Sequence, residues 1–169
     1  NGKPVYIRGN NKVPLDHLYS NVSPETYEWC VRAMANENVN LVRVWGGGII
    51  ETELFYDLCD KYGIMVWQDF AMACGYYPQS ESFYNKMYTE AKAVVRRLRN
   101  HPSIILWAGD NECDCFVVPD WGSSHTDADQ PAMLNPNYNK LTRDVILKEP
   151  RNHDATRPYL PSSPYLDEV

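Results

Sequence analysis

Short apolar runs alternate along this chain with longer segments in which apolar residues recur at helical spacing. Five short segments are predicted to be strands: 4–9, 39–45, 64–69, 103–109 and 159–162. The second, third and fourth are almost continuously apolar, which is typical of parallel strands that are covered on both faces. The chain is therefore expected to build a parallel sheet.

Four helices are predicted between these strands, because apolar residues recur there at i, i+3, i+4 and i+7. The first begins at 23–25, where a capping serine precedes a proline at the first helical position. The second carries the apolar stripe of 54–62 and ends at Gly63, and the others cover about 82–99 and 137–148. Strands and helices thus alternate, which predicts an α/β fold.

Loop lengths favour a (β/α)8 barrel over a doubly wound sheet, which the alternation also allows. The strand-to-helix links 71–81 and 113–136 are long and the helix-to-strand links are short, as in barrel enzymes. The glycine run 46–48 matches neither GxGxxG nor a Walker motif, so nucleotide binding is not indicated. A whole barrel needs eight strands and about 250 residues. We therefore expect 1–169 to be the N-terminal portion of a catalytic TIM barrel, with strands 1–5 and helices 1–4.

Charge and hydropathy argue against two classes of partner. The formal net charge is −6 and no basic stripe is present, so nucleic acid is not an expected partner. No apolar run approaches the roughly 18 residues of a membrane span, so no membrane partner is expected. An open parallel sheet exposes two strand edges, through which the chain is expected to associate with another copy or a complementary half.

Aromatic and sulfur-containing side chains are numerous. Five Trp and twelve Tyr is a high count, and flat aromatic faces stack on sugar rings as well as packing in cores. Cys30 and Cys59 fall on apolar helix faces and are interpreted as core residues. A zinc site of Cys113, Cys115 and His125 would use a Cys-x-Cys spacing that is not typical of structural zinc, so neither a metal nor another cofactor is expected.

Polar side chains gather where the predicted strands end, which is where barrel enzymes carry their chemistry. They are Arg8, Asn10, Arg43, Trp45, Gln68, Asp69, Asp110, Asn111 and Glu112. A carboxylate close behind the apolar run 104–108 is costly to desolvate without a reason. One interpretation is a structural network, in which the arginines at 8 and 43 pair with the carboxylates at 69 and 112. The other is a glycosidase site, where two carboxyls flank the scissile bond and one is protonated near neutral pH.

Longer stretches resemble glycoside hydrolase family 2, and within it the β-mannosidases. These stretches are 43–51 (RVWGGGIIE), 55–60 (FYDLCD), 66–70 (VWQDF), 97–103 (RLRNHPS), 111–112 (NE) and 157–164 (RPYLPSSP). The resemblance runs in order through nearly the whole chain. It implies a retaining exo-β-mannosidase that needs no cofactor and removes terminal β-D-mannosyl residues from oligosaccharides or glycoconjugates.

The resemblance also implies roles for single residues. Glu112 is expected to be the general acid/base, and Asn111 to contact the sugar near its 2-hydroxyl group. Trp45 resembles a tryptophan of the terminal-sugar pocket, although simple barrel packing would also explain it. Trp121 is expected to form an aromatic wall, and Asp69 to orient its neighbours rather than react.

The chain departs from the family pattern in two respects. Where the family usually reads Gly-Asn-Asn-Glu, 109–112 reads Gly-Asp-Asn-Glu. The family's nucleophilic glutamate lies on a later strand, so this chain is expected to lack it, together with the β-sandwich domains, and to be inactive alone. The alternatives are another family 2 exo-glycosidase (β-galactosidase, β-glucuronidase or exo-glucosaminidase) or a non-catalytic sugar-binding or association module. The family suggests a lysosomal, periplasmic or secreted protein, and the compartment stays open.

Overall fold

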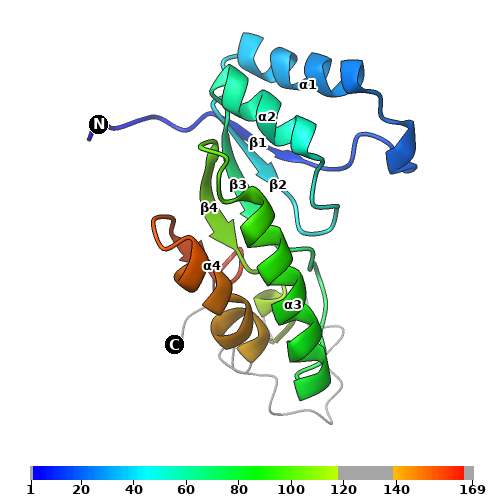
Figure 1. The fold of residues 1–169 in the computed structure, drawn as a ribbon, viewed down its shortest axis with the longest axis vertical. Helices are drawn as coiled ribbons and strands as arrows, with labels where there is room; N and C mark the ends of the chain where they lie inside the picture. The colour runs from blue at the N-terminus through cyan, green and yellow to red at the C-terminus, as the bar shows by residue number, and fades with distance from the viewer. Residues whose placement is uncertain (1, 118–138, 166–169) are drawn as a thin grey trace.

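The computed structural model describes residues 2–117 and 139–165, and these contain a five-stranded sheet (Figure 1). Its strands are β1 (Gly9–Lys12), β2 (Leu41–Val44), β3 (Met65–Asp69), β4 (Ile104–Ala108) and β5 (Tyr159–Leu160). The strands lie in chain order, and every neighbouring pair is parallel. A doubly wound sheet reverses its strand order at a switch point, whereas a barrel wall keeps one direction. The described strands therefore form part of a barrel wall.

Helices follow each of the first four strands and cover one side of the sheet (Figure 1). They are α1 (Pro24–Asn36), α2 (Glu53–Tyr62), α3 (Glu81–Leu98), the π-helical segment η5 (Leu141–Ile146) and α4 (Lys148–His153). The loops in the described part of the chain contain the short 3₁₀ turns η1 (Tyr19–Asn21) and η2 (Asp114–Val117). Helix α1 packs beside α2, and α3 packs beside α4 and η5. None of the described helices is long and apolar enough to span a bilayer.

The ends of the first two helices form as their residues predict. The Ser23 side chain accepts a hydrogen bond from the Thr26 amide, and Pro24 takes the first helical position. Gly63 closes α2 with a φ of 71°, the left-handed conformation that glycine adopts without strain. The predicted boundaries of these two helices are confirmed there.

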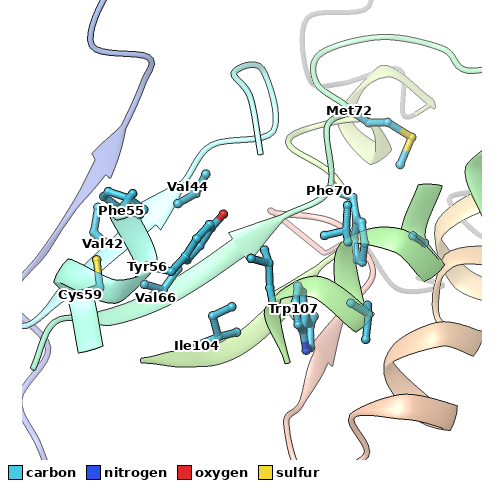
Figure 2. Close-up of a cluster of buried hydrophobic side chains, with 14 of the residues drawn as sticks. Val42, Val44, Phe55, Tyr56, Cys59, Val66, Phe70, Met72, Ile104 and Trp107 are labelled. Atoms are coloured by element: carbon cyan, nitrogen blue, oxygen red, sulfur yellow. The ribbon is translucent and has the colours of Figure 1, made fainter. Parts of the chain in front are cut away.

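The core lies between the sheet and the helices (Figure 2). Val42, Val44 and Val66 point from the strands toward Phe55 and Tyr56 of α2. On the opposite face of the same strands, side chains at alternate positions are only half-buried: Leu41, Arg43, Met65 and Trp67. The sheet is therefore covered by helices on one face, where the sequence predicted cover on both.

The first strand lies five residues later than predicted. The apolar residues Val5, Tyr6 and Ile7 are exposed, and β1 instead comprises the polar stretch Gly9–Lys12. The Asn40 side chain donates to the Tyr6 carbonyl oxygen and accepts from the Arg8 amide. These backbone groups are therefore hydrogen-bonded to a side chain rather than to a neighbouring strand. Lys12 then enters the core, where it pairs with the buried Glu51.

The fourth helical segment also differs from its prediction of 137–148. Residues 137 and 138 lie outside the described part of the chain, and the helix continues to His153 through η5 and α4. Pro150 lies within this helical segment and does not end it. The fifth strand is shorter than predicted and comprises only Tyr159–Leu160.

Candidate active site

The carboxyl ends of β2, β3 and β4 bring Arg43, Asp69, Asn111 and Glu112 to one edge of the sheet. Asn111 extends the pairing past the strand ends, because it forms isolated bridges with Ala73 and Ser163. The Glu112 amide donates to the Ser163 carbonyl oxygen at 3.0 Å. Backbone hydrogen bonds thus fix the segment that carries both residues.

Asp69 is almost fully buried and accepts several hydrogen bonds. Arg43 Nη2 lies 2.7 Å from its Oδ2, the Trp67 indole donates to Oδ1 at 2.9 Å, and the Gly46 amide donates to Oδ2 at 3.0 Å. Burial raises the pKa of Asp69, and the hydrogen bonds from Arg43 act in the opposite direction. Both oxygens are occupied, so Asp69 is suited to orienting Arg43 and Trp67.

Asn111 connects this ion pair to the segment that follows β4. Its Oδ1 accepts from Arg43 Nη2 at 3.0 Å, and its Nδ2 donates to the Cys74 sulfur at 3.3 Å. The Cys74 thiol in turn donates to Glu112 Oε2 at 3.3 Å. Hydrogen bonds therefore link the arginine to the candidate acid/base.

Glu112 is half-buried and has a φ of 62°, a conformation that is unfavourable for a residue with a β-carbon. Its carboxyl group is thus held near solvent at the end of a buried strand. Such a group can exchange protons with a bound molecule, and its position follows from the backbone.

Asp110 lies beneath the site and is fully buried. Its carboxylate accepts from the Ser162 hydroxyl, the Cys113 amide and the Asn139 side chain. Burial raises the pKa of Asp110 to about 7, and the neighbouring Asp114 adds to the rise. Asp110 therefore joins the end of β4 to the segments around Ser162 and Asn139.

The glycines after β2 allow Trp45 and the backbone to take their positions. A β-carbon at Gly46 would lie 2.3 Å from the Met72 carbonyl oxygen, and one at Gly47 would lie 2.1 Å from the Trp45 indole. Only glycine fits such approaches. Trp45 itself is half-buried at the same edge of the sheet as Asn111.

The alternative structural network, in which arginines 8 and 43 pair with carboxylates 69 and 112, exists only in part. Arg43 pairs with Asp69 as that interpretation expects. Arg8 does not take part, because its guanidinium donates to the carbonyl oxygen of Asn38, in the exposed link between α1 and β2. Its expected pairing with a carboxylate is wrong, and the physical reason is the shift of β1 along the chain.

Cys74, which contacts both Asn111 and Glu112, was missed by the sequence reasoning. It lies in the long loop after β3, and the only available signal was that long strand-to-helix loops carry function. Trp121, the expected aromatic wall, lies outside the described residues.

Two groups of side chains contain residue types that can bind a metal. Cys113 and Cys115 are buried, and His125 lies outside the described part of the chain. Within the described residues, Asp57, Asp60 and His101 come close enough to hold a cation, at the amino end of β4. His101 Nδ1 already lies 2.7 Å from Asp60, and its Nε2 lies 3.2 Å from Glu53. Hydrogen bonds of the imidazole with the two carboxylates account for this cluster.

Comparison with known proteins identifies the family. The model of the TIM barrel domain of glycosyl hydrolases family 2 matches residues 1–159. A β-mannosidase from Capra hircus is 39% identical over 169 residues, and the alignment covers 97% of this chain and 18% of that protein. β-Mannosidase B from Thermothelomyces thermophilus is 45% identical over 170 residues, covering 95% of this chain and 19% of that protein.

Solved structures agree with the fold. The crystal structure of β-D-mannosidase from Dictyoglomus thermophilum superposes with a TM-score of 0.85 at 40% identity, covering 96% of this chain and 19% of that one. A Bacteroides uniformis β-glucuronidase superposes with a TM-score of 0.72 at 23% identity, which supports the fold alone. The chain thus spans less than a fifth of these relatives, and the predicted partial barrel is confirmed. It belongs to glycosyl hydrolase family 2, within the TIM barrel domain of that family.

Proposed function

We propose that this chain is the N-terminal portion of the catalytic barrel of a retaining exo-β-mannosidase, with Glu112 as its general acid/base. The observation that carries the proposal is the half-buried Glu112 carboxyl at the carboxyl end of β4, next to Asn111. Barrel enzymes place their catalytic groups at this end of the strands. The identity to named β-mannosidases favours a β-mannoside as substrate over other family 2 substrates.

In the proposed reaction, Glu112 first donates a proton to the oxygen of the leaving group. A second carboxylate attacks the anomeric carbon, and Glu112 then deprotonates the water that releases the sugar. The proposed role of Asn111 is to contact the sugar near its 2-hydroxyl group, where hydrogen bonds strengthen as positive charge develops. Arg43 supports this role, because it holds the Asn111 amide in one orientation.

The remaining residues shape the sugar pocket in this proposal. Trp45 lines the pocket of the terminal sugar, supported by its half-exposed position at the edge of the sheet. Asp69 orients Arg43 and does not react, because its oxygens are occupied. Trp121 is proposed as an aromatic wall because it follows Glu112 in the long loop 113–136.

The nucleophile is proposed to lie outside this chain. Among the described residues near Glu112, Asp69 is paired with Arg43, Asp110 is fully buried, and Asp114 pairs with Arg143. None of these carboxylates is available to attack a sugar. A purified sample of this chain should therefore give no turnover of an aryl β-mannoside. Robust hydrolysis that disappears in Glu112→Gln would contradict this part of the proposal.

The role of Glu112 is testable in a full-length protein that carries this segment. Glu112→Ala should lower kcat/KM for p-nitrophenyl β-mannoside by about 10²–10⁴-fold, the usual contribution of general acid–base catalysis. The loss should be much smaller for a dinitrophenyl mannoside, whose leaving group needs no proton, and azide should restore the second step. Glu90→Gln, on the exposed side of α3, is the matched control. Equal losses on both mannosides would reject the acid/base role, and faster turnover of a galactoside or glucuronide would reject the substrate.

A further inference from the structure

The Cys74 thiol is the last link in a series of hydrogen bonds that runs from Arg43 to Glu112. The series begins at Arg43, which is held by Asp69, and continues through the Asn111 side chain to the Cys74 sulfur. Its last member joins the Cys74 sulfur to Glu112 Oε2 at 3.3 Å. Side chains from β2, β3 and the segments that follow β3 and β4 are thus linked in series, and among them Cys74 alone contacts the carboxyl oxygen.

The direction of every hydrogen bond in this series follows from its first member. A guanidinium can only donate, so the Asn111 group that faces Arg43 is the carbonyl oxygen Oδ1. The other end of the amide, Nδ2, can also only donate, so the Cys74 sulfur accepts from it. The thiol proton is then directed to Glu112 Oε2.

We infer that Cys74 is a positioning residue for the acid/base reaction: its thiol donates to Oε2 of Glu112 and fixes the orientation of that carboxyl group. The inference rests on the proposed function of Glu112. Because Oε2 is occupied as an acceptor, the proton that Glu112 transfers is carried by Oε1. Among the residues that the structure describes, no hydrogen bond reaches Oε1.

The thiol remains a donor at neutral pH. Cys74 is exposed, but partial desolvation raises the pKa of its thiol above the ordinary value of 9.0, and the hydrogen bond with Glu112 raises it further. A protonated thiol is a poor nucleophile, so this cysteine is suited to hydrogen bonding rather than to covalent chemistry.

The backbone holds the sulfur in place independently of the side-chain contacts. Cys74 has a φ of 50°, and its amide donates to the Asn111 carbonyl oxygen at 2.8 Å. The residue that carries the thiol is therefore bound to the residue just before Glu112. A left-handed conformation of a non-glycine residue persists only where the surroundings enforce it, and such residues cluster at active sites.

The test compares leaving groups in the full-length protein that carries this segment. Cys74→Ala should lower kcat/KM for a p-nitrophenyl or alkyl β-mannoside by about tenfold, the loss expected for one hydrogen bond. For a dinitrophenyl β-mannoside, the loss should be less than about twofold, because no proton transfer is needed. Cys74→Ser should recover most of the activity, because a hydroxyl group donates and accepts as the thiol does.

Two further variants separate positioning from a loss of folding. Cys74→Gly removes the thiol and suits the positive φ, so it should reproduce the kinetics of Cys74→Ala with an unchanged thermal midpoint. Cys30→Ala, on α1, is the matched control and should behave as the unmodified protein. Equal losses on all leaving groups, or a Cys74→Ser variant as slow as Cys74→Ala, would overturn the inference.

The same assay with Glu112→Ala distinguishes this inference from the proposed function. If Glu112→Ala shows the dependence on the leaving group and Cys74→Ala does not, only the role of Cys74 fails. If Glu112→Ala itself shows no such dependence, the acid/base assignment fails, and the role of Cys74 fails with it.

Discussion

Cys74 and Glu112 meet at the candidate site, and both have left-handed backbone conformations, with φ of 50° and 62°. Each conformation is unfavourable by about 1–2 kcal/mol for a residue with a β-carbon. Hydrogen bonds from the two amides, to the carbonyl oxygens of Asn111 and Ser163, hold these conformations. At the residue scale, the site therefore stores strain to present a thiol and a carboxyl to each other.

Asp110 makes the stability of the fold depend on pH. Its pKa is about 7 in the folded state and 3.8 in the absence of structure, so the folded state binds more protons between these values. Stability is therefore expected to fall as pH rises through this window, by at most about 1.4 kcal/mol per pH unit. The side chain of Asp110→Asn cannot ionise. The free energy of unfolding of this variant, relative to the unmodified protein, should therefore be higher near about pH 8 than near about pH 5.

Urea unfolding at the two pH values measures this difference. Asp144→Asn, an exposed neighbour on η5, is the matched control and should show no such trend. If Asp110→Asn changes the free energy of unfolding equally at both pH values, burial does not raise the pKa of Asp110 as proposed. The asparagine also restores the residue that the family usually carries at this position.

At the scale of elements, a buried ion pair fixes β1 to the helices. Lys12 of β1 pairs with Glu51, and the Tyr27 hydroxyl of α1 donates to the same carboxylate at 2.8 Å. Burial and the contact with Glu51 raise the pKa of Tyr27 to about 12, so its hydroxyl remains a donor. Arg97 of α3 donates to the Glu51 backbone carbonyl oxygen. Three elements thus depend on one residue that precedes α2.

Breaking this pair on one side should be strongly destabilising. Glu51→Gln leaves the Lys12 charge buried without a partner, and a loss of about 3–5 kcal/mol in the free energy of unfolding is expected. Adding Lys12→Met should recover most of that loss, because the second change removes the unpaired charge. Denaturant unfolding of the single and double variants measures the coupling.

The exposed pair Glu28–Lys61 provides the control. Its side chains are 46% and 60% exposed, so Lys61→Met should change stability by less than about 1 kcal/mol. A double variant no more stable than Glu51→Gln alone would show that the loss comes from packing rather than from charge.

The elements differ in how far their residues predict them. The runs in β2, β3 and β4 are apolar enough to predict buried strands, and Ser23 and Gly63 mark helix ends by their own chemistry. The first strand was misplaced, because exposed Val5–Ile7 shows the same apolar pattern as a buried strand. Long-range contacts distinguish the two, namely the pair of Lys12 with Glu51 and the hydrogen bonds of the Asn40 side chain, and no local pattern predicts such contacts.

The candidate site was also predictable only in part. Arg43, Asp69, Asn111 and Glu112 follow from the rule that parallel strands end at one edge. The role of Cys74 depends on a loop conformation with positive φ, which no periodicity encodes.

At the scale of the whole molecule, the described sheet is open at both ends. β1 and β5 each have a strand on one side only within the described residues, and Val5, Tyr6 and Ile7 are exposed next to β1. Unpaired strand edges with apolar neighbours favour association. We propose that the chain self-associates through the edge formed by residues 5–12.

Sedimentation velocity at several protein concentrations tests this proposal. The purified chain should sediment faster as its concentration rises, and Tyr6→Lys should weaken the association, because a charged residue disfavours edge pairing. Trp29→Lys removes a similarly exposed aromatic residue from α1 and should leave the association unchanged. A single species that is independent of concentration would reject the proposal.

The cluster around His101 lies at the opposite end of β4 from Glu112, and it couples the binding of a proton to folding. Burial lowers the pKa of His101, but hydrogen bonds with Asp60 and Glu53 outweigh it and raise the pKa overall. The folded chain therefore binds this proton more tightly than the unfolded chain, and the resulting stability is complete at low pH and is lost as pH rises through the raised pKa. By mass action, acidifying the solution acts as the addition of a stabilising ligand does.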